Sequence, residues 1–582
     1  MTVNRYRDCV PEKRRSLGTM LAALLMQGCL AALQVADAAE SSEPPTLIIQ
    51  SAKVYTPSGW KEAVAVKGQR ILATGTNQEI LALRGQHTRV IDLHGRALLP
   101  GLHDSHAHPF FAGAKLRECT LAPGATARQL LDTVAKCVAR ARPGQWIVGG
   151  GWDMTGLDAP PTRQMLDQVA PDNPVMLSDF SFHSRWINSR AIAAAGITRS
   201  TPNPDGGVIA RDANGEATGI VSENATALVE AHVPQPDLAL GMADMRAALN
   251  IMLSQGITSF VDAWASERVM EVYQALDRTS ELKQRVTACR RFDPDSVLTY
   301  EQLQYSGRRF ASDCIKLFLD GVPLTPRTAS VLVPYVGMEH DPEHAYGLLL
   351  WKQEQLNTFV TLADKAGFQV KMHAAGDGAV RQAIKAVRAA REGNGYLGRM
   401  HSVAHIGWLG EGDADIARRS GAALEFSPYV WYTSPGNEIV RGVVGDERMK
   451  GWYPVREAID AGNVVLAGSD WPVVPSVNPW LGMETLVTRK APGNDGAALA
   501  PTHAITLKEA FDIYTVNAAS YEGKRMALGA IEAGLWADMI VTDWNPFEVP
   551  IGEVHNTRVV GVFINGEEVV PVRIGRSSGK PR

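Results

Sequence analysis

Five short segments of the chain end an apolar, strand-like run with a side chain that can bind a metal. In the first segment His106 and His108 stand two positions apart, and side chains at i and i+2 of a strand point the same way, so both imidazoles can bind one ion. This spacing and the order of the segments indicate a metal centre assembled from distant parts of the chain. The other four donors are Lys316 in 314–318, His373 in 370–373, His405 in 402–405 and Asp470 in 465–470.

The single histidines of this set, taken alone, have an ordinary structural explanation. A lone histidine on an apolar strand is more often a satisfied core residue than a metal ligand. Lysine, however, is almost never fully buried without a partner, and Lys316 stands inside an apolar run. Asp470 raises the same difficulty at the end of its strand. One metal centre accounts for all six side chains together, so the sequence favours metal binding.

The donors belong to a series of eight strand-like runs that alternate with helical patterns. This alternation predicts an α/β fold, a (β/α)8 TIM barrel, whose active site lies at the carboxyl ends of its parallel strands. The donors then fall on strands one, four, five, six and eight and converge on one rim. The predicted strands are 101–108, 257–264, 285–292, 314–320, 369–375, 402–407, 423–428 and 464–470.

The two ends of the chain carry β signals, and a long insertion interrupts the barrel. Thr46–Tyr55 alternates apolar and polar residues, and Asn565-Gly566 predicts a hairpin turn. The stretch after the first strand is far too long for a loop, so we expect an inserted cap subdomain above the barrel mouth. The predicted units are a composite β-sandwich domain of 46–100 plus 529–575, the barrel of 101–108 plus 251–528, and the cap of 109–250.

Composition and charge narrow the class of protein. The 582 residues are too many for one ordinary core, and 45% hydrophobic with 21% charged residues are typical of a globular protein. The formal net charge of −4 gives no electrostatic basis for binding nucleic acid or an anionic membrane surface.

Residues 1–39 are predicted to be a signal peptide. Basic residues precede the apolar stretch Leu17–Leu33, and Ala36-Asp37-Ala38 forms a small-residue cleavage site. Because the stretch is short for a membrane span, we expect export to the periplasm or the medium, with no stable span after cleavage. An uncleaved anchor, or a lipoprotein attached through Cys29, is the alternative.

Export would place the mature chain where disulfides persist. Four cysteines follow the signal, and the sequence alone allows three pairings among them. We favour Cys119–Cys137 because these two are close in the chain, while four unpaired buried thiols are the alternative. The four cysteines are Cys119, Cys137, Cys289 and Cys314.

The sequence around the donors resembles the amidohydrolase superfamily, and within it the family 3 branch to which N-substituted formamide deformylases belong. The likeness covers nearly the whole mature chain. The segments that carry it are Leu99–His108, Gly151-Trp152-Asp153, Phe182-His183, Trp186-Ile187-Asn188, Ile315-Lys316, Asp320-Gly321, Gly468-Ser469-Asp470, Leu528–Gly534, Ala537-Asp538 and Asn545-Pro546.

This resemblance implies a centre of two divalent metal ions. Lys316, carboxylated by carbon dioxide, would bridge them, whereas an unmodified Lys316 would leave a site for one metal. Zinc is the expected metal because imidazole and carboxylate-type oxygen suit it, with iron, nickel or manganese as alternatives. The implied ligands are His106 and His108 on one ion, His373 and His405 on the second, the bridging Lys316, and Asp470.

The expected reaction is hydrolysis of a C–N bond other than a peptide bond, in an amide, formamide or cyclic amide. A metal lowers the pKa of bound water from about 15.7 to about 7, so hydroxide is available at neutral pH. Asp470 would accept the proton of that water and pass it to the leaving nitrogen, while the second metal polarises the carbonyl. The expected partners are a small amide-like molecule and, in a homodimer, a second copy of the chain.

Four further residues are predicted to contact the substrate. His183 in the insertion is equally well explained as a structural residue. Arg327 is suited to bind a substrate carboxylate, although most arginines are simply solvated. Trp152 and Trp431 indicate an apolar or aromatic pocket, although aromatic residues in loops more often pack in a core.

Other functions are open to the same fold. A deaminase or an ester hydrolase would use the same metal site. A non-catalytic binding or regulatory scaffold would be expected to have lost ligands, and all six positions are present. A periplasmic solute-binding protein would lack the metal set altogether.

Overall fold

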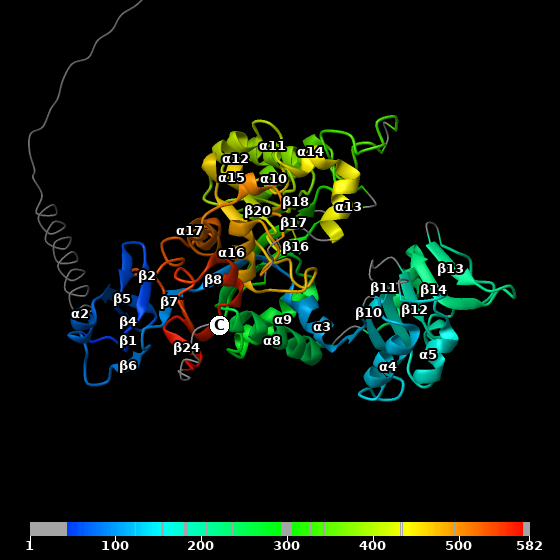
Figure 1. Ribbon diagram of the computed structural model, residues 1–582, viewed down its shortest axis with the longest axis horizontal. Coiled ribbons are helices and arrows are strands. Elements are labelled where there is room, and N and C mark those ends of the chain that lie inside the picture. The colour runs from blue at the N-terminus through cyan, green and yellow to red at the C-terminus, as the bar shows by residue number, and fades with distance from the viewer. Residues whose placement is uncertain are drawn as a thin grey trace, which may run out of the picture.

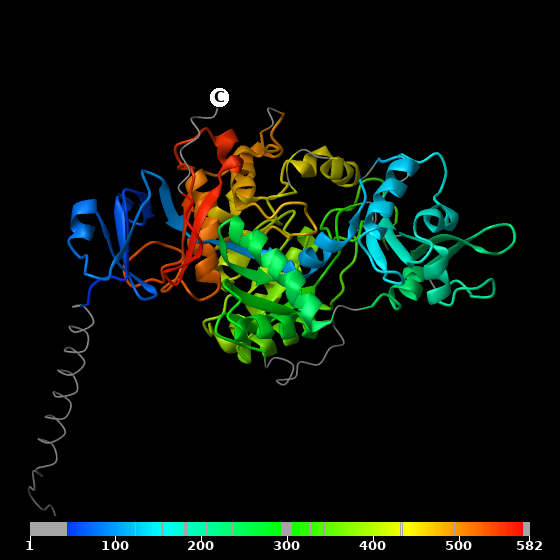
Figure 2. The same cartoon turned by 90° about the horizontal axis from the view of Figure 1, so that it is seen from below.

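Three bodies follow one another along the long axis of the protein: β-sheets from the chain ends, a barrel, and the sheet of the insertion (Figures 1 and 2). The predicted signal peptide lies outside the described residues. Among the helices of the described part, none combines the length and the apolar character that a membrane crossing requires. The computed structural model describes residues 43–573 except 123, 153–155, 180–183, 205–206, 235–236, 293–304, 325–326, 342–343, 431, 433–434 and 494–495.

Eight parallel strands form the central barrel, in the order β21-β20-β19-β18-β17-β16-β15-β8. Hydrogen bonds join its two end strands just beyond β21: Asp470 N donates to His106 O at 2.7 Å and His108 N donates to Trp471 O at 2.8 Å. The predicted (β/α)8 barrel and all eight of its strands are confirmed. The strands are β8 (Leu102–Ala107), β15 (Ile257–Asp262), β16 (Arg285–Arg291), β17 (Phe310–Phe318), β18 (Gln369–His373), β19 (Ser402–Ala404), β20 (Ala423–Phe426) and β21 (Val465–Ala467).

Helices surround the barrel and cover its apolar outer face. Their ends follow local signals; Thr506 and Glu509, for example, form a capping box at the start of α17. The helices are α8 (Leu238–Ser254), α9 (Glu267–Arg278), α10 (Gln353–Lys365), α11 (Asp377–Asn394), α12 (Asp413–Ser420), α13 (Pro435–Val444), α14 (Asp446–Met449), α15 (Val455–Asp460), α16 (Pro479–Thr488), α17 (Leu507–Asp512) and α18 (Ala518–Tyr521).

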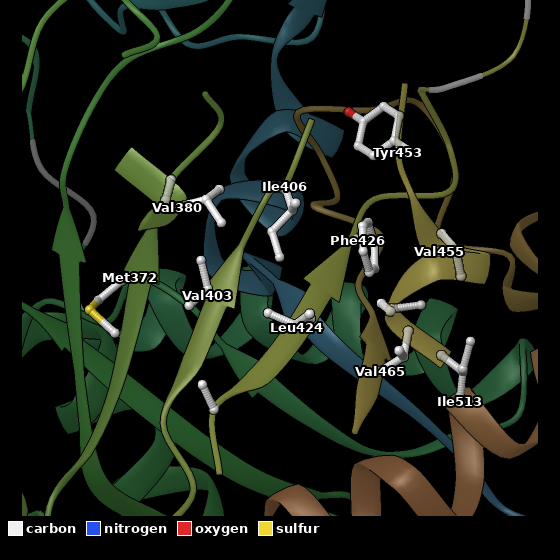
Figure 3. Close-up of a cluster of buried hydrophobic side chains, with 14 of the residues drawn as sticks. Met372, Val380, Val403, Ile406, Leu424, Phe426, Tyr453, Val455, Val465 and Ile513 are labelled. Carbon is white, nitrogen blue, oxygen red and sulfur yellow. The ribbon is translucent and has the colours of Figure 1, made fainter. Parts of the chain in front are cut away.

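Alternation along the strands separates the apolar outer face of the barrel from a polar interior. Leu424 on β20 and Met372 on β18 belong to the apolar layer between strands and helices (Figure 3). Successive side chains of a strand point to opposite faces, so Glu425 faces the interior. Lys371 and His373, on either side of Met372, face the interior for the same reason. The interior is therefore where charged side chains gather.

The two β-rich chain ends meet in one six-stranded sheet, ordered β24-β23-β22-β7-β2-β3. A four-stranded sheet, β5-β4-β1-β6, comes from the N-terminal segment alone. Apolar side chains of both sheets, among them Val66, Val54 and Phe563, form one core, which gives the predicted sandwich. The strands are β1 (Leu47–Gln50), β2 (Lys53–Thr56), β3 (Gly59–Lys61), β4 (Ala63–Lys67), β5 (Arg70–Gly75), β6 (Arg89–Asp92), β7 (Ala97–Pro100), β22 (Met539–Thr542), β23 (Val559–Ile564) and β24 (Glu567–Val570), with helix α2 (Asn77–Leu81).

Two changes of chain direction in this sandwich can be compared with the β signals of the sequence. Asn565 and Gly566 have φ of 54° and 73°, as a tight hairpin turn between β23 and β24 requires. The alternating segment Thr46–Tyr55, in which β structure was predicted, contributes to two strands that lie in different sheets. The break falls at Ser51, whose φ of 50° turns the chain out of the first sheet.

The insertion after β8 contains a six-stranded sheet of its own, ordered β13-β14-β12-β11-β10-β9. The predicted boundary at residue 250 cuts through helix α8, which starts at Leu238 and ends at Ser254. This helix shares an apolar core with α9 and the barrel strand β15, so we propose a boundary before α8. The elements are α3 (Pro109–Arg117), β9 (Cys119–Thr120), α4 (Ala127–Val138), β10 (Ile147–Trp152), α5 (Arg163–Val169), β11 (Val175–Asp179), β12 (Ser184–Ile187), α6 (Ser189–Ala194), β13 (Gly207–Arg211), β14 (Ala217–Glu223) and α7 (Ala227–Glu230).

Two disulfides hold strands in place. Cys119–Cys137 joins β9 to α4 in the insertion, and this predicted pairing is confirmed. Cys289–Cys314 joins the neighbouring barrel strands β16 and β17. The second bridge lies two residues before Lys316 on β17.

Candidate metal centre

The predicted donors lie together at the carboxyl end of the barrel strands. Asp470 Oδ1 lies 3.0 Å from His108 Nε2 and 3.7 Å from His106 Nε2. Lys316 Nζ lies 3.4 Å from the same nitrogen of His106. Strands one, four and eight therefore bring four donors into direct contact.

His405 and His373 extend this group toward strands five and six. The ring of His405 lies 4.5 Å from that of His106 and 4.6 Å from that of His373, measured between centroids. One ligand atom from each of His106, His405 and Asp470 lies within 4.8 Å of the others, a spacing that suits a metal ion. The remaining donors each contact a member of this trio, so all six lie in one cluster.

Two of the donors have a left-handed backbone. His405 has φ of 70° and Asp470 has φ of 57°. Non-glycine residues rarely adopt this conformation, which costs energy and concentrates at functional sites. Each of the two follows the end of a barrel strand, where the change of backbone direction places its side chain at the mouth.

Gly468 allows the last strand to pass the first at this point. A Cβ atom on Gly468 would lie 2.2 Å from the Cβ of His106, closer than two such atoms approach. Any larger residue would push the segment that carries Asp470 away from His106. The Gly468-Ser469-Asp470 motif thus combines close approach with placement of a carboxylate.

Three of the imidazoles have a polar partner on Nδ1. An ionised carboxylate can only accept a hydrogen bond, so a neutral histidine whose Nδ1 faces a carboxylate carries its proton on Nδ1. Its Nε2 is then unprotonated and points away from the carboxylate. The carboxylates beside His106 and His373 therefore fix the tautomer that binds a metal through Nε2. The hydroxyl beside His405 can donate or accept, so it leaves that tautomer open. The pairs are His106 with Glu425 Oε1 at 2.6 Å, His373 with Asp320 Oδ1 at 3.2 Å, and His405 with Ser427 Oγ at 3.4 Å.

Burial keeps these donors in the forms that bind metals. Burial, and next the charge of Lys316 or of a neighbouring histidine, hold the pKa of His106 and of His405 well below 6.5, so both are neutral at neutral pH. Neutral imidazole together with carboxylate oxygen is a donor set that suits zinc and related divalent ions. The residues therefore fit the expected metal.

Lys316 is buried beside a second lysine. Its register partner on β18 is Lys371, and both side chains are 1% exposed or less. Burial, and next the charge of Lys371, lower the pKa of Lys316 from 10.5 to about 7, although Glu425 and Asp470 act in the opposite direction. A large share of the amine is therefore uncharged near neutral pH, and an uncharged amine is the form that reacts with carbon dioxide.

The residues predicted to contact substrate are spread more widely. His183 and Trp431 lie outside the described residues. Trp152 is 4% exposed in the core of the insertion, where its indole donates to Leu177 O at 3.0 Å. Arg327 lies in the loop after β17 with φ of 52°. A substrate role for these four residues stays a prediction.

Some buried polar residues at the centre were not anticipated from the sequence. Glu425 and Lys371 stand inside apolar strands, as Lys316 does, and the same argument about the cost of buried charge applies to them. Asp320 accepts hydrogen bonds from Ala375 N and Gly376 N as well as facing His373. These two donors lie in the loop after β18, and only the folded structure shows that this loop passes Asp320.

Comparison with known proteins identifies the family of the chain. Residues 89–570 match the model of the amidohydrolase family. A putative amidohydrolase YtcJ of Bacillus subtilis (strain 168) is 28% identical over 521 residues, 87% of this chain and 96% of that protein. An N-substituted formamide deformylase of Arthrobacter pascens is 28% identical over 532 residues, 87% of this chain and 94% of that protein.

The fold also matches solved structures. That of an uncharacterized metal-dependent hydrolase from Pyrococcus furiosus superposes with a TM-score of 0.71 at 24% identity, and the match covers 86% of this chain and all of that one. The family match spans most of the sequence, including every residue of the cluster at the barrel mouth. The chain belongs to the amidohydrolase family.

Proposed function

We propose that the protein is an exported, metal-dependent amidohydrolase that cleaves a non-peptide C–N bond in a small amide, formamide or cyclic amide. The observation that carries the proposal is the meeting of four histidines, Asp470 and a buried lysine at one end of the barrel. Family membership supports hydrolysis. The similarity to a relative named as an N-substituted formamide deformylase directs attention to formamides and related amides.

Two zinc ions bridged by a carboxylated Lys316 are the proposed occupants. When bound, such ions polarise a carbonyl and lower the pKa of water. Carboxylation of Lys316 would replace a buried cation by an anion next to Lys371, and this removes the repulsion between two buried ammonium groups. The residues that would hold the ions are His106 and His108 for one, His373 and His405 for the other, and Asp470.

Asp470 is the residue proposed to move the proton. Its carboxylate touches His108 and, at 17% side-chain exposure, can still be reached from the barrel mouth. A carboxylate in this position can accept a proton from water and give it to the leaving nitrogen. Its left-handed backbone holds the side chain at the site before substrate arrives.

Phe318 is proposed to contact the apolar part of the substrate. Its ring stacks on His373 with 5.3 Å between centroids, and Trp264 meets its edge at 5.2 Å. Both rings are partly exposed. This aromatic wall beside the donors favours an amide whose substituent is apolar.

Export is proposed on the signal-like first 39 residues and is supported by the two disulfides, since such bridges persist mainly in oxidising compartments. Secretion of the full-length chain from a bacterial host, followed by N-terminal sequencing of the mature protein, tests this proposal. Mature protein that begins near residue 39 would support it, and uncleaved protein in the cytoplasm would contradict it.

Metal analysis and a substrate screen test the catalytic proposal. The purified chain is assayed for bound metal and for turnover of N-formyl, N-acyl, lactam, ester and amino-purine compounds. Hydrolysis of an amide-type compound with two metals per chain supports the proposal. Turnover of esters alone, or deamination alone, would assign the site to the other chemistry, and metal binding without any turnover would indicate a scaffold.

A further inference from the structure

We propose that Lys371 and Glu425 are a positioning pair of the metal centre, in which Glu425 holds His106 with Nε2 toward the other donors and Lys371 holds Glu425. Both residues are buried and Glu425 contacts His106, so the pair acts through that histidine. The inference rests on the proposed metal-binding function.

A row of three buried side chains carries the proposal. Glu425 Oε1 lies 2.6 Å from His106 Nδ1, and the other oxygen, Oε2, forms an ion pair with Lys371 Nζ. The three side chains are 1%, 1% and 0% exposed. Both oxygens of the carboxylate therefore have a partner, one on each side.

The fold of the barrel explains why these residues meet. The interior of such a barrel is filled by layers of side chains to which alternate strands contribute. His106, Lys371 and Glu425 lie on strands one, five and seven, and each faces the interior. Alternate strands therefore bring Lys371 and Glu425 beside His106, which is itself one of the donors.

A purely structural explanation of the ion pair is weak. Two charges lose their hydration when they are buried, and apolar residues of similar size often stabilise a protein better than a buried ion pair does. Here the carboxylate also accepts from an imidazole that faces the donor cluster. A carboxylate behind a metal-binding histidine fixes its ring and raises its basicity, which is a reason to retain the charge.

A second buried row of a carboxylate, a histidine and a basic side chain lies elsewhere in the barrel domain and offers a matched control. Asp364 Oδ1 lies 3.0 Å from His401 Nε2 and accepts from Arg391 Nη1 at 2.6 Å. Val370 N donates to His401 Nδ1 at 3.0 Å, so both ring nitrogens are used within the protein. This triad lies before β19, at the end of the strand opposite to His405, and has no place in the proposed centre.

The test measures zinc affinity of the metal-free full chain by competition with a chromophoric chelator, and the visible spectrum after Co²⁺ is added. Glu425→Gln keeps an oxygen for His106 but loses the charge; we expect zinc affinity to fall about 10- to 100-fold and the Co²⁺ bands to shift. Asp364→Asn should lower the thermal midpoint yet leave zinc affinity within about twofold of wild type. Circular dichroism confirms that each variant is folded.

Lys371→Met and the double variant Lys371→Met/Glu425→Gln complete the design. Because Lys371 acts through Glu425, we expect the double variant to lose no more zinc affinity than Glu425→Gln alone. The double variant buries no unpaired charge and serves if a single variant fails to fold. Full additivity of the two losses would overturn the inference.

The failures of the two proposals can be told apart. Wild-type affinity and spectrum in folded Glu425→Gln, or an equal loss in Asp364→Asn, would overturn the positioning role while the metal centre stands. A wild-type chain that binds no zinc at all would overturn both.

Discussion

Ser469 Oγ donates a hydrogen bond to Asp104 Oδ2 at 2.6 Å, and Ser469 N donates to the other oxygen of this carboxylate at 3.0 Å. His106 N donates to that second oxygen as well, also at 3.0 Å. Asp104 thus ties the first barrel strand to the segment that follows the last one. Two proposed ligands lie close by in the chain: His106 is two residues after Asp104, and Asp470 directly follows Ser469. This buried carboxylate therefore adds a side-chain link to the backbone hydrogen bonds that close the barrel at the site.

Ser469→Ala removes the side-chain hydrogen bond of this link. Loss of a buried hydrogen bond to a charged group lowers the free energy of unfolding by about 1.5–3 kcal/mol. We therefore expect a lower thermal midpoint and weaker zinc binding. Calorimetry and chelator competition measure the two effects. Ser254→Ala, at an exposed helix end, is the control, and equal behaviour of the two variants would remove the proposed role of the link.

Asp470→Asn keeps the shape of the side chain and removes its ability to accept a proton. We expect kcat to fall by about 10²- to 10⁴-fold on the best amide substrate, because general acid–base catalysis contributes factors of this size. The assay is run at saturating zinc so that weaker binding does not limit the rate. Asp415→Asn on the outer face of α12 is the control, and unchanged turnover in Asp470→Asn would take this aspartate out of the mechanism.

Removal of metal is expected to lower both activity and stability. An ion that binds only the folded chain stabilises it by about 2.7 kcal/mol at a hundred times its Kd, so a chelator should lower the thermal midpoint and zinc should restore it. If Lys316 is carboxylated, zinc with bicarbonate should reactivate the metal-free protein faster than zinc in carbonate-free buffer. Reactivation that does not depend on bicarbonate would argue for an unmodified lysine.

Phe318→Ala removes the ring that stacks on His373 and leaves Trp264 in place. If the wall binds the apolar substituent of the substrate, KM for an aromatic amide should rise about tenfold, while KM for a small aliphatic amide should change little. Steady-state kinetics on the two substrates measure the difference. Phe359→Ala, on the helix side of the barrel, is the control for general loosening, and equal effects on both substrates would exclude Phe318 as a specificity residue.

Acid sensitivity should depend in part on Asp364. Burial raises its pKa, but hydrogen bonds from His401, Asn394 and Arg391 outweigh this and lower it to about 2. The folded-state value lies below the ordinary 3.8, so the carboxylate stabilises the protein above about pH 4, and this contribution is lost as pH falls toward 2. The difference in thermal midpoint between wild type and Asp364→Asn should therefore shrink as pH is lowered from 5 to 3. A difference that stays constant would contradict the lowered pKa.

The barrel and its donors could be predicted because local rules decide them. Strands with an apolar face and helices between them recur along the chain, and side-chain alternation follows directly from the strand period. A charged residue such as Lys316 in an apolar run is costly enough to bury that its presence indicates a function. Six donor positions and eight strands were predicted in this way.

Other features depend on which strands meet. The segment Thr46–Tyr55 is interrupted at Ser51 because its two halves pair in different sheets. The second disulfide forms because β16 and β17 are neighbours in the barrel. The left-handed backbones of His405 and Asp470 arise where strands end at the mouth.

The sequence by itself determined that six side chains of the types that can bind a metal lie near the ends of strands in a parallel barrel, because composition and period act over a few neighbouring residues. Only the tertiary structure decided that Glu425 stands between His106 and Lys371, and that Asp104 joins Ser469. These contacts link residues far apart in the chain, and strand register and barrel closure select them. Local sequence patterns do not specify which buried charged residues pair, because alternation alone allows each of them several partners.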